Sequence, residues 1–226
     1  MLEAAFNTIK AQIAAAQALA GDSLGGVQPE VHLVAVSKQQ PDEKIDAALA
    51  TGHRLYGENR VQEAFERWAH RRAAYPDLTL HLIGPLQSNK AADAVALFDV
   101  IESIDRPKIA AALAKEMRTQ SRHIPCFVQV NTGQEAQKSG IDPEYCVEFV
   151  AQCRDVHGLE IAGLMCIPPQ DEEAAMHFAL LKKLAREANV AHLSMGMSAD
   201  FEEAIAFGAD YVRVGSALFG TRLARG

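Results

Sequence analysis

Eight short apolar runs, about 25 residues apart, constrain the fold of this chain more than any other feature of its sequence. Most of them are continuously apolar rather than alternating, which is typical of parallel strands covered on both faces. Helical patterns separate the runs, so strand and helix alternate along the chain. This order predicts an α/β fold, a single (β/α)8 barrel of the TIM type, in preference to an open sheet. The predicted strands are residues 31–36, 55–56, 80–83, 100–102, 126–130, 161–165, 192–195 and 211–214.

The segment before the first predicted strand has the spacing of an amphipathic helix. One face carries apolar residues at intervals of 4, 3, 4, 3 and 4 residues, namely Leu2, Phe6, Ile9, Ile13, Ala16 and Ala20. Glu3 is acidic where a secretory signal would be basic, so we interpret the segment as a packed helix of a cytoplasmic protein. No linker rich in Pro, Gly or Ser divides the 226 residues, so residues 1–226 are expected to form one barrel domain with an extra N-terminal helix.

The charge balance and the cysteines exclude several classes of function. Lys and Arg number 22 against 29 Asp and Glu, and a net charge of −7 opposes binding to nucleic acid. No apolar stretch has the length of a membrane span, so we expect no membrane insertion. The cysteines form no C-x-x-C pair and have no His at zinc-ligand spacing, which predicts free buried thiols in a reducing cytosol and no metal site. They are Cys126, Cys146, Cys153 and Cys166.

In a barrel of this type, the residues that follow each strand carry the chemistry. Lys38 follows the first predicted strand, so its amine is expected at the barrel mouth, among apolar residues. Partial burial lowers the pKa of a lysine and frees a nucleophilic amine, which a Schiff base with an aldehyde requires. The alternative is a surface lysine at the start of a loop.

Small residues and hydroxyl residues follow the last two predicted strands. The segments 194–198 and 215–220 place Ser198, Gly215 and Ser216 where backbone N–H groups and hydroxyls can converge on an anion. The seventh and eighth loops are where such barrels commonly hold a phosphate group. These residues therefore predict phosphate binding, with simple helix caps and tight turns as the alternative.

Arg213 lies inside the last predicted strand, where an apolar side chain would otherwise be expected. A buried guanidinium needs an acceptor. Two interpretations are open: the acceptor is the ring nitrogen of a ligand, or Arg213 forms an internal salt bridge with Glu58 or Glu102. Lys38, the phosphate segments and Arg213 together describe a site for pyridoxal phosphate (PLP).

Five longer motifs resemble those of a known family. They are residues 34–38 (VAVSK), 56–59 (YGEN), 81–90 (HLIGPLQSNK), 163–165 (GLM) and 193–200 (LSMGMSAD). These motifs are similar to those of the pyridoxal phosphate homeostasis proteins, also called the YggS or PROSC family, and the resemblance runs from about residue 31 to residue 220. It implies a barrel like the N-terminal domain of alanine racemase, with PLP bound as an aldimine to Lys38.

The resemblance also implies the composition of the cofactor site. Its residues would be Lys38, Asn59, Met165, Ser194, Met195, Ser198, Arg213, Gly215 and Ser216. The three serines, Met195 and Gly215 would contact the phosphate. Arg213 would lie beside the pyridine nitrogen and Asn59 near the ring hydroxyl. Further pocket candidates are His81 and Ser103.

Two positions bear on how the cofactor would be handled. Many family members have a second basic residue shortly after the Schiff-base lysine, whereas Gln39 and Gln40 follow Lys38 here, which puts a local lysine relay in doubt. Lys138 is a candidate for a secondary PLP site, and a solvated loop lysine is the alternative.

The function that the resemblance implies is binding, buffering and delivery of PLP without turnover of a substrate, so no catalytic residue is expected. PLP-dependent apo-enzymes are the partners that delivery would involve, and a monomer is expected because no exposed apolar stripe is evident. Two enzymatic alternatives stay open, a PLP-dependent racemase or decarboxylase-type enzyme and a barrel aldolase that uses Lys38. A racemase of this fold needs a tyrosine from a second domain, and eight βα units in 226 residues are expected to leave no room for one.

Overall fold

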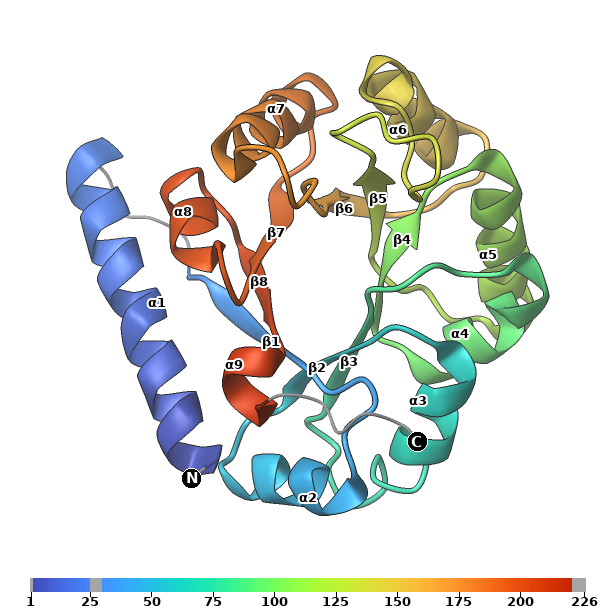
Figure 1. The fold of residues 1–226 in the computed structure, drawn as a ribbon. Helices are drawn as coiled ribbons and strands as arrows, with labels where there is room; N and C mark the ends of the chain where they lie inside the picture. Colours follow the sequence, from blue (N-terminus) through green and yellow to red (C-terminus); the bar gives the residue numbers. More distant parts are fainter. Residues whose placement is uncertain (1, 25–29, 221–226) are drawn as a thin grey trace.

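The computed structural model describes residues 2–24 and 30–220 and shows a closed barrel of parallel strands surrounded by helices (Figure 1). The strands are β1 His32–Val36, β2 Leu55–Glu58, β3 Thr79–Leu82, β4 Val100–Ile104, β5 Cys126–Val130, β6 Ile161–Cys166, β7 His192–Met197 and β8 Tyr211–Val214. They pair in sequence order, and β8 closes the barrel by pairing with β1. The predicted (β/α)8 barrel is confirmed.

Helices alternate with these strands and cover the outside of the barrel (Figure 1). They are α1 Leu2–Leu24, α2 Asp42–Ala50, α3 Val61–Trp68, α4 Ala91–Leu97, α5 Pro107–Gln120, α6 Cys146–Asp155, α7 Ala174–Glu187, α8 Phe201–Ala206 and α9 Ser216–Phe219, with short 3-10 turns η1 Ser88–Lys90 and η2 Pro143–Tyr145. Gly52 and Gly208 follow α2 and α8 with φ of +82° and +98°. Glycine adopts this left-handed conformation at little cost, so the chain leaves each helix and enters the next strand.

Three strands continue further toward the barrel mouth than the apolar pattern predicts. β2 extends to Glu58, β4 to Ile104 and β7 to Met197, each two residues past the predicted end, while the other bounds agree within one residue. The apolar runs are interrupted at these positions by polar or small residues. Because backbone pairing does not depend on the polarity of the side chain, the hydrogen-bonded ladder continues through them.

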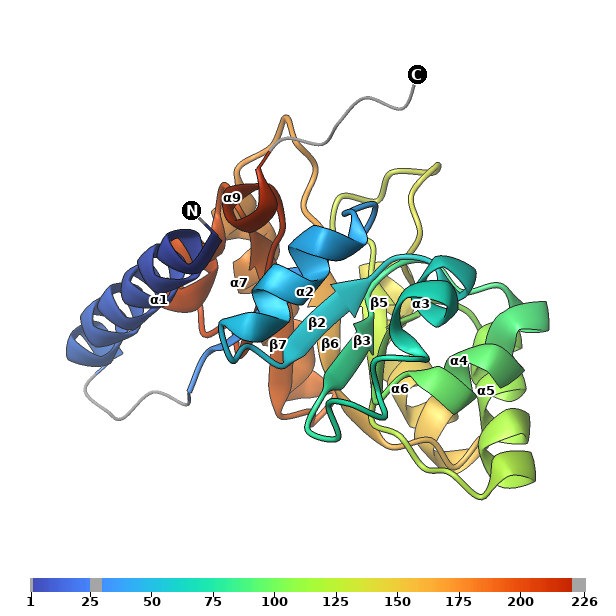
Figure 2. The same ribbon diagram turned by 90° about the horizontal axis from the view of Figure 1, so that it is seen from below.

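The predicted N-terminal helix is confirmed, and it packs against α8 and α9 on one flank of the barrel (Figures 1 and 2). Its apolar face is buried at Phe6, Ile9, Ile13 and Ala20, as the spacing indicates. The Phe6 ring lies 6.3 Å from the ring of Phe219 in α9. The extra helix therefore supports the segment that follows the last strand.

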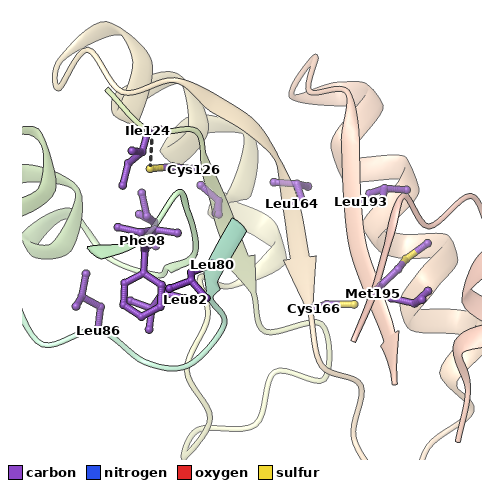
Figure 3. Close-up of a cluster of buried hydrophobic side chains, with 14 of the residues drawn as sticks. Leu80, Leu82, Leu86, Phe98, Ile124, Cys126, Leu164, Cys166, Leu193 and Met195 are labelled. Atoms are coloured by element: carbon purple, nitrogen blue, oxygen red, sulfur yellow. Dashed lines mark hydrogen bonds between the residues drawn. The ribbon is translucent and has the colours of Figure 1, made fainter. Parts of the chain in front are cut away.

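The apolar core has two parts, separated by the wall of the barrel. Outward-facing strand residues such as Leu80, Leu164 and Met195 belong to the larger part, which fills the space between strands and helices (Figure 3). Inside the barrel, Val100 and Phe127 pack with Met165. Gly163 makes room for this inner layer, because a Cβ there would lie 2.5 Å from Phe127 Cε1 and 2.2 Å from the carbonyl oxygen of His192.

The four cysteines are free and buried, as predicted. Burial raises the pKa of Cys146, Cys153 and Cys166 to about 12, so these thiols stay protonated at neutral pH. Within residues 2–24 and 30–220, no group of His, Cys, Asp or Glu side chains has the arrangement of a metal site. Among the described helices, none is both long and apolar enough to cross a membrane.

Candidate functional site

The carboxyl ends of β1, β7 and β8 bring the predicted lysine and phosphate segments to one side of the barrel mouth. β8 pairs with β1 on one side and with β7 on the other. The end of β8 lies close to β1 because residue 215 is glycine, where a Cβ would be 3.3 Å from the Val36 carbonyl oxygen. Lys38 follows Val36 by two residues, so it lies at the same end of the barrel as this segment.

Lys38 is half-buried and occupies a tight turn directly after β1. The Gln40 N–H donates to the Ser37 carbonyl oxygen over 3.1 Å, which closes the turn. Gln39 has φ of +60°, a conformation that costs a non-glycine residue roughly 1 kcal/mol. The local sequence therefore does not favour this turn, and the surrounding contacts must hold it.

Glu58, at the end of β2, is the centre of those contacts and is fully buried. Its Oε1 accepts hydrogen bonds from Ser37 Oγ at 2.7 Å, Arg67 Nη1 at 2.8 Å and Trp68 Nε1 at 3.0 Å. Arg67 also donates through Nη2 to the Gln40 carbonyl oxygen at 3.3 Å. The alternative of a salt bridge between Glu58 and Arg213 is not what the structure shows, because Glu58 faces α3 and pairs with Arg67. Neither Arg67 nor Trp68 was predicted to serve the site.

Three of the predicted phosphate residues converge in the structure. Ser198 Oγ accepts a hydrogen bond from the Gly215 N–H at 3.4 Å and lies 3.2 Å from Ser216 Oγ. The chain reaches Ser198 through Gly196, which has φ of +90° and would place a Cβ 2.5 Å from Ala204 Cβ. Two hydroxyls and an amide are thereby gathered into one small cluster, which provides donors for an anionic oxygen.

The other two predicted phosphate residues lie elsewhere, on opposite faces of β7. Ser194 is buried inside the barrel, where its hydroxyl contacts Glu102 and Arg213. Met195 faces outward into the helix-covered core, near Leu193 (Figure 3). Successive side chains of a strand point to opposite faces.

Arg213 is 3% exposed and spans the barrel interior. Its Nη1 donates to Ser194 Oγ at 2.6 Å, and its Nη2 donates to the carbonyl oxygen of Cys166 at 2.7 Å. The alternative of a salt bridge to Glu102 is met only indirectly, because the Ser194 hydroxyl lies between the two groups and donates to Glu102 Oε2 at 2.5 Å. The guanidinium and the carboxylate are therefore connected through a serine.

His81 completes this line of contacts, with its Nδ1 2.5 Å from Glu102 Oε1. Burial raises the pKa of the Glu102 carboxyl, but His81, Arg213 and Ser194 outweigh burial and hold the pKa below its ordinary value. Met165 is fully buried inside the barrel, on the strand that pairs with β7 at Ser194. The predicted residues His81 and Met165 are thus brought to the same interior region as Arg213.

Asn59 Oδ1 and Ser103 Oγ are among the buried polar atoms that have no hydrogen-bond partner within the described residues. Asn59 also lines a cavity of about 710 Å³, together with Pro85, Gln87 and Arg106. An acceptor buried without a donor costs free energy unless a ligand supplies the donor. Asn59 Oδ1 can therefore accept a hydrogen bond from a hydroxyl group of a ligand. Gly84 holds this segment close, since a Cβ there would lie 2.2 Å from the Asn59 carbonyl oxygen.

Lys138 lies in the loop after β5 and pairs with Glu135 over 2.5 Å between Nζ and Oε2. Its side chain is 35% exposed. This placement is that of a partly solvated loop lysine with an acidic neighbour.

Comparison with known proteins identifies relatives that span nearly the whole chain. The pyridoxal phosphate homeostasis proteins of Vibrio cholerae and Pseudomonas aeruginosa are 38% and 40% identical, over 95% and 94% of this chain and 93% and 94% of their own lengths. The structure of PipY from Synechococcus elongatus PCC7942 with PLP bound is similar with a TM-score of 0.81 and 35% identity, over 97% of this chain and 100% of that chain.

A more distant likeness defines the wider fold group. Alanine racemase from Bartonella henselae matches with a TM-score of 0.73 at 16% identity, over 98% of this chain and 58% of that chain, a likeness of fold alone. The family model for the alanine racemase N-terminal domain matches residues 8–223. Taken with the curated relatives above 30% identity, this match means that the chain belongs to the pyridoxal phosphate homeostasis protein family, which has the alanine racemase N-terminal domain.

Proposed function

We propose that this protein binds PLP covalently through Lys38 and acts in PLP homeostasis as a carrier, without turnover of a substrate. The observation that carries the proposal is the closeness of two features on neighbouring strand ends. The Lys38 turn follows β1, and the cluster of Ser198, Gly215 and Ser216 follows β7 and β8. The likeness to PipY, whose structure contains PLP, supports PLP binding.

The phosphate group would be held by the Gly215 N–H and by the hydroxyls of Ser198 and Ser216, and Ser198 Oγ already lies within 3.4 Å of the other two groups. Oriented backbone and hydroxyl donors of this kind form anion-binding concavities. Met195 would contribute its backbone only. Ser194 would not contact the phosphate and would act indirectly, through its hydrogen bond with Arg213.

The ring of the cofactor would lie between Asn59 and Arg213. Asn59 Oδ1, buried and without a donor, would accept from the ring hydroxyl, and Met165 would contribute buried apolar surface. Bound PLP supplies an aldehyde for a lysine amine and, in enzymes, an electron sink for carbanions. A guanidinium keeps its proton, so Arg213 offers the ring nitrogen a hydrogen bond without protonating it. This weakens the electron sink and favours storage over catalysis.

We further infer a monomer in the cytoplasm, with PLP-dependent apo-enzymes as recipients of the cofactor. Four buried free thiols fit a reducing compartment. Leu19 on α1 and Phe65 on α3, two of the exposed large apolar side chains, lie on different helices. Light scattering of the purified protein tests the monomer, and transfer of PLP to an apo-enzyme, compared with free PLP at equal concentration, tests delivery.

The decisive experiment is an absorption spectrum with and without borohydride, followed by mass analysis of peptides. We expect a visible band for the PLP-loaded protein, its loss on reduction, and a pyridoxyl phosphate mass on the Lys38 peptide. Lys38→Ala is expected to abolish the band, and Lys138→Ala, the matched control in a loop, to retain it. A protein that stays colourless with added PLP would refute the proposal, and a sugar adduct on Lys38 would point to an aldolase.

The racemase or decarboxylase alternative has its own test. PLP-loaded protein is incubated with single L-amino acids in deuterated water, and loss of the α-proton is followed by NMR. We expect no exchange above that of free PLP, since Arg213 beside the ring nitrogen would leave that nitrogen unprotonated. Exchange that depends on Lys38 would refute the carrier function and indicate a PLP-dependent enzyme.

A further inference from the structure

A continuous line of four polar side chains crosses the interior of the barrel and involves four different strands. It runs from His81 on β3 to Glu102 on β4, then to Ser194 on β7 and Arg213 on β8. All four residues are at most 3% exposed. Interiors of such barrels are usually filled by branched apolar side chains, so four linked polar groups there need an explanation beyond packing.

The hydrogen bonds of this line have a defined direction. An ionised carboxylate only accepts, so His81 donates from Nδ1 to Oε1 of Glu102, and Ser194 donates its hydroxyl proton to Oε2. With its proton committed to Glu102, the Ser194 oxygen presents lone pairs to Arg213 Nη1 at 2.6 Å. The carboxylate thereby determines which way the serine hydroxyl points.

The charges along the line also connect Glu102 with Arg213. Arg213 carries a positive charge in the barrel interior, and Glu102 is the negative charge that compensates it through Ser194. The groups that face Glu102 are His81, Ser194, Arg213 and the nearby ring of Tyr211, whose pKa is raised by burial and by Glu102. A buried guanidinium without a counter-charge is strongly disfavoured.

We propose that Glu102 and Ser194 are positioning residues for Arg213, which hold its guanidinium in one orientation and balance its charge beneath the cofactor ring. The inference rests on the proposed function for the identity of the ring, but the ordering of Arg213 belongs to the protein itself. His81 fixes the far oxygen of Glu102, so that the near oxygen faces Ser194.

Replacement of Glu102 by Gln removes the fixed direction of the hydrogen bonds along this line of side chains. If the amide oxygen of Gln accepts from His81, its NH2 group faces Ser194, whose oxygen then receives donors from both sides. The serine hydroxyl can no longer donate along the line, and Arg213 loses its counter-charge. Ser194→Ala removes the connection but keeps both charges, so the two variants perturb Arg213 in different ways.

The first test uses cofactor-free protein and NMR of arginine guanidinium groups. In the wild type we expect slowly rotating, slowly exchanging Nη signals for Arg213, assigned by their loss in Arg213→Lys. These signals are expected to broaden beyond detection in Ser194→Ala and in Glu102→Gln. The matched control is Asp210→Asn, a buried acid that accepts from the Leu193 N–H at 2.7 Å and does not contact Arg213. It is expected to keep the wild-type Arg213 signals.

The second test uses the PLP-loaded protein and measures affinity and the pH at which the visible band changes. Ser194→Ala is expected to bind PLP about tenfold more weakly, because a guanidinium that is no longer held must be ordered when the ring binds. Glu102→Gln leaves the positive charge uncompensated, which eases loss of a proton from the bound cofactor, so the transition is expected to fall by about one pH unit. Asp210→Asn is expected to match the wild type.

These outcomes separate the inference from the proposed function. If the wild type acquires no visible band, the proposed function fails, while the guanidinium signals still test the positioning of Arg213. If the wild type binds PLP and both variants keep its signals, affinity and pH transition, the positioning role is refuted. A shift of the same size in Asp210→Asn would also refute it, because general destabilisation would then explain the effect. If Glu102→Gln does not fold, Ser194→Ala decides alone.

Discussion

The close approach of Gly84 to Asn59 leads to a quantitative prediction for the substitution Gly84→Ala. An added Cβ would lie 2.2 Å from the Asn59 carbonyl oxygen and 2.6 Å from its Cα, both of which are backbone atoms. Ordinary carbon–oxygen contacts are about 1 Å longer, so the segment carrying Asn59 must move by about that distance. Overpacking of this kind costs about 1–3 kcal/mol in the free energy of unfolding.

The same displacement is expected to weaken cofactor binding. A shift of about 1 Å breaks the hydrogen bond proposed between Asn59 Oδ1 and the ring hydroxyl, which corresponds to about tenfold weaker binding of PLP. Urea unfolding of the cofactor-free protein measures the first effect, and a PLP titration followed by absorbance measures the second.

Gly158→Ala is the matched control for Gly84→Ala. Gly158 is exposed, has φ of +67° and has no atom within 4 Å of an added Cβ. Only backbone strain of about 1 kcal/mol is expected, with unchanged PLP affinity. The reasoning is refuted if Gly84→Ala unfolds at the same urea concentration as Gly158→Ala and binds PLP as tightly as the wild type.

Three further predictions concern stability. Burial lowers the pKa of His53 to about 4 from 6.5, so its contribution to the free energy of unfolding is complete above pH 6.5 and about 3 kcal/mol is lost as the pH falls to 4. His53→Phe should remove this part of the pH dependence of urea unfolding. An unchanged dependence of the free energy of unfolding on pH would contradict this. Gly163→Ala should cost about 3 kcal/mol, because its Cβ meets the Phe127 ring and a backbone carbonyl; a stability loss below 1 kcal/mol in denaturant titration would count against this. Trp68→Phe removes one donor from Glu58 and should cost about 1 kcal/mol while retaining PLP binding; a neutral effect on the unfolding midpoint would argue that the donor is replaceable.

The outline of the site could be predicted because its parts are local in the sequence. Lys38 follows a strand, and Ser198, Gly215 and Ser216 follow two others, so a correct strand count places all of them at one end of a barrel. The separation of Ser194 from Met195 was also within reach, because adjacent residues of a strand face opposite sides. Residues 194–198 therefore do not form a single phosphate segment.

The side chains that hold the site could not be predicted in the same way. A direct salt bridge between Arg213 and a glutamate was one of the two open interpretations, but the contact of Arg213 with Glu102 runs through Ser194, 92 residues further along the chain than Glu102. The carboxylate of Glu58 pairs instead with Arg67 on α3. Such pairings depend on side-chain lengths and on small offsets between strands, including the irregular register between β7 and β8.

By itself, the sequence determined the repeating order of strand and helix, the packed N-terminal helix and the residue types at the barrel mouth, since each depends on local periodicity or on position after a strand. Only the tertiary structure decided which face of β7 each residue occupies, which donors surround Glu58 and how Arg213 is held. Those features arise when strands distant in sequence close into a barrel, because only then do buried polar groups find the partners that offset the cost of their desolvation.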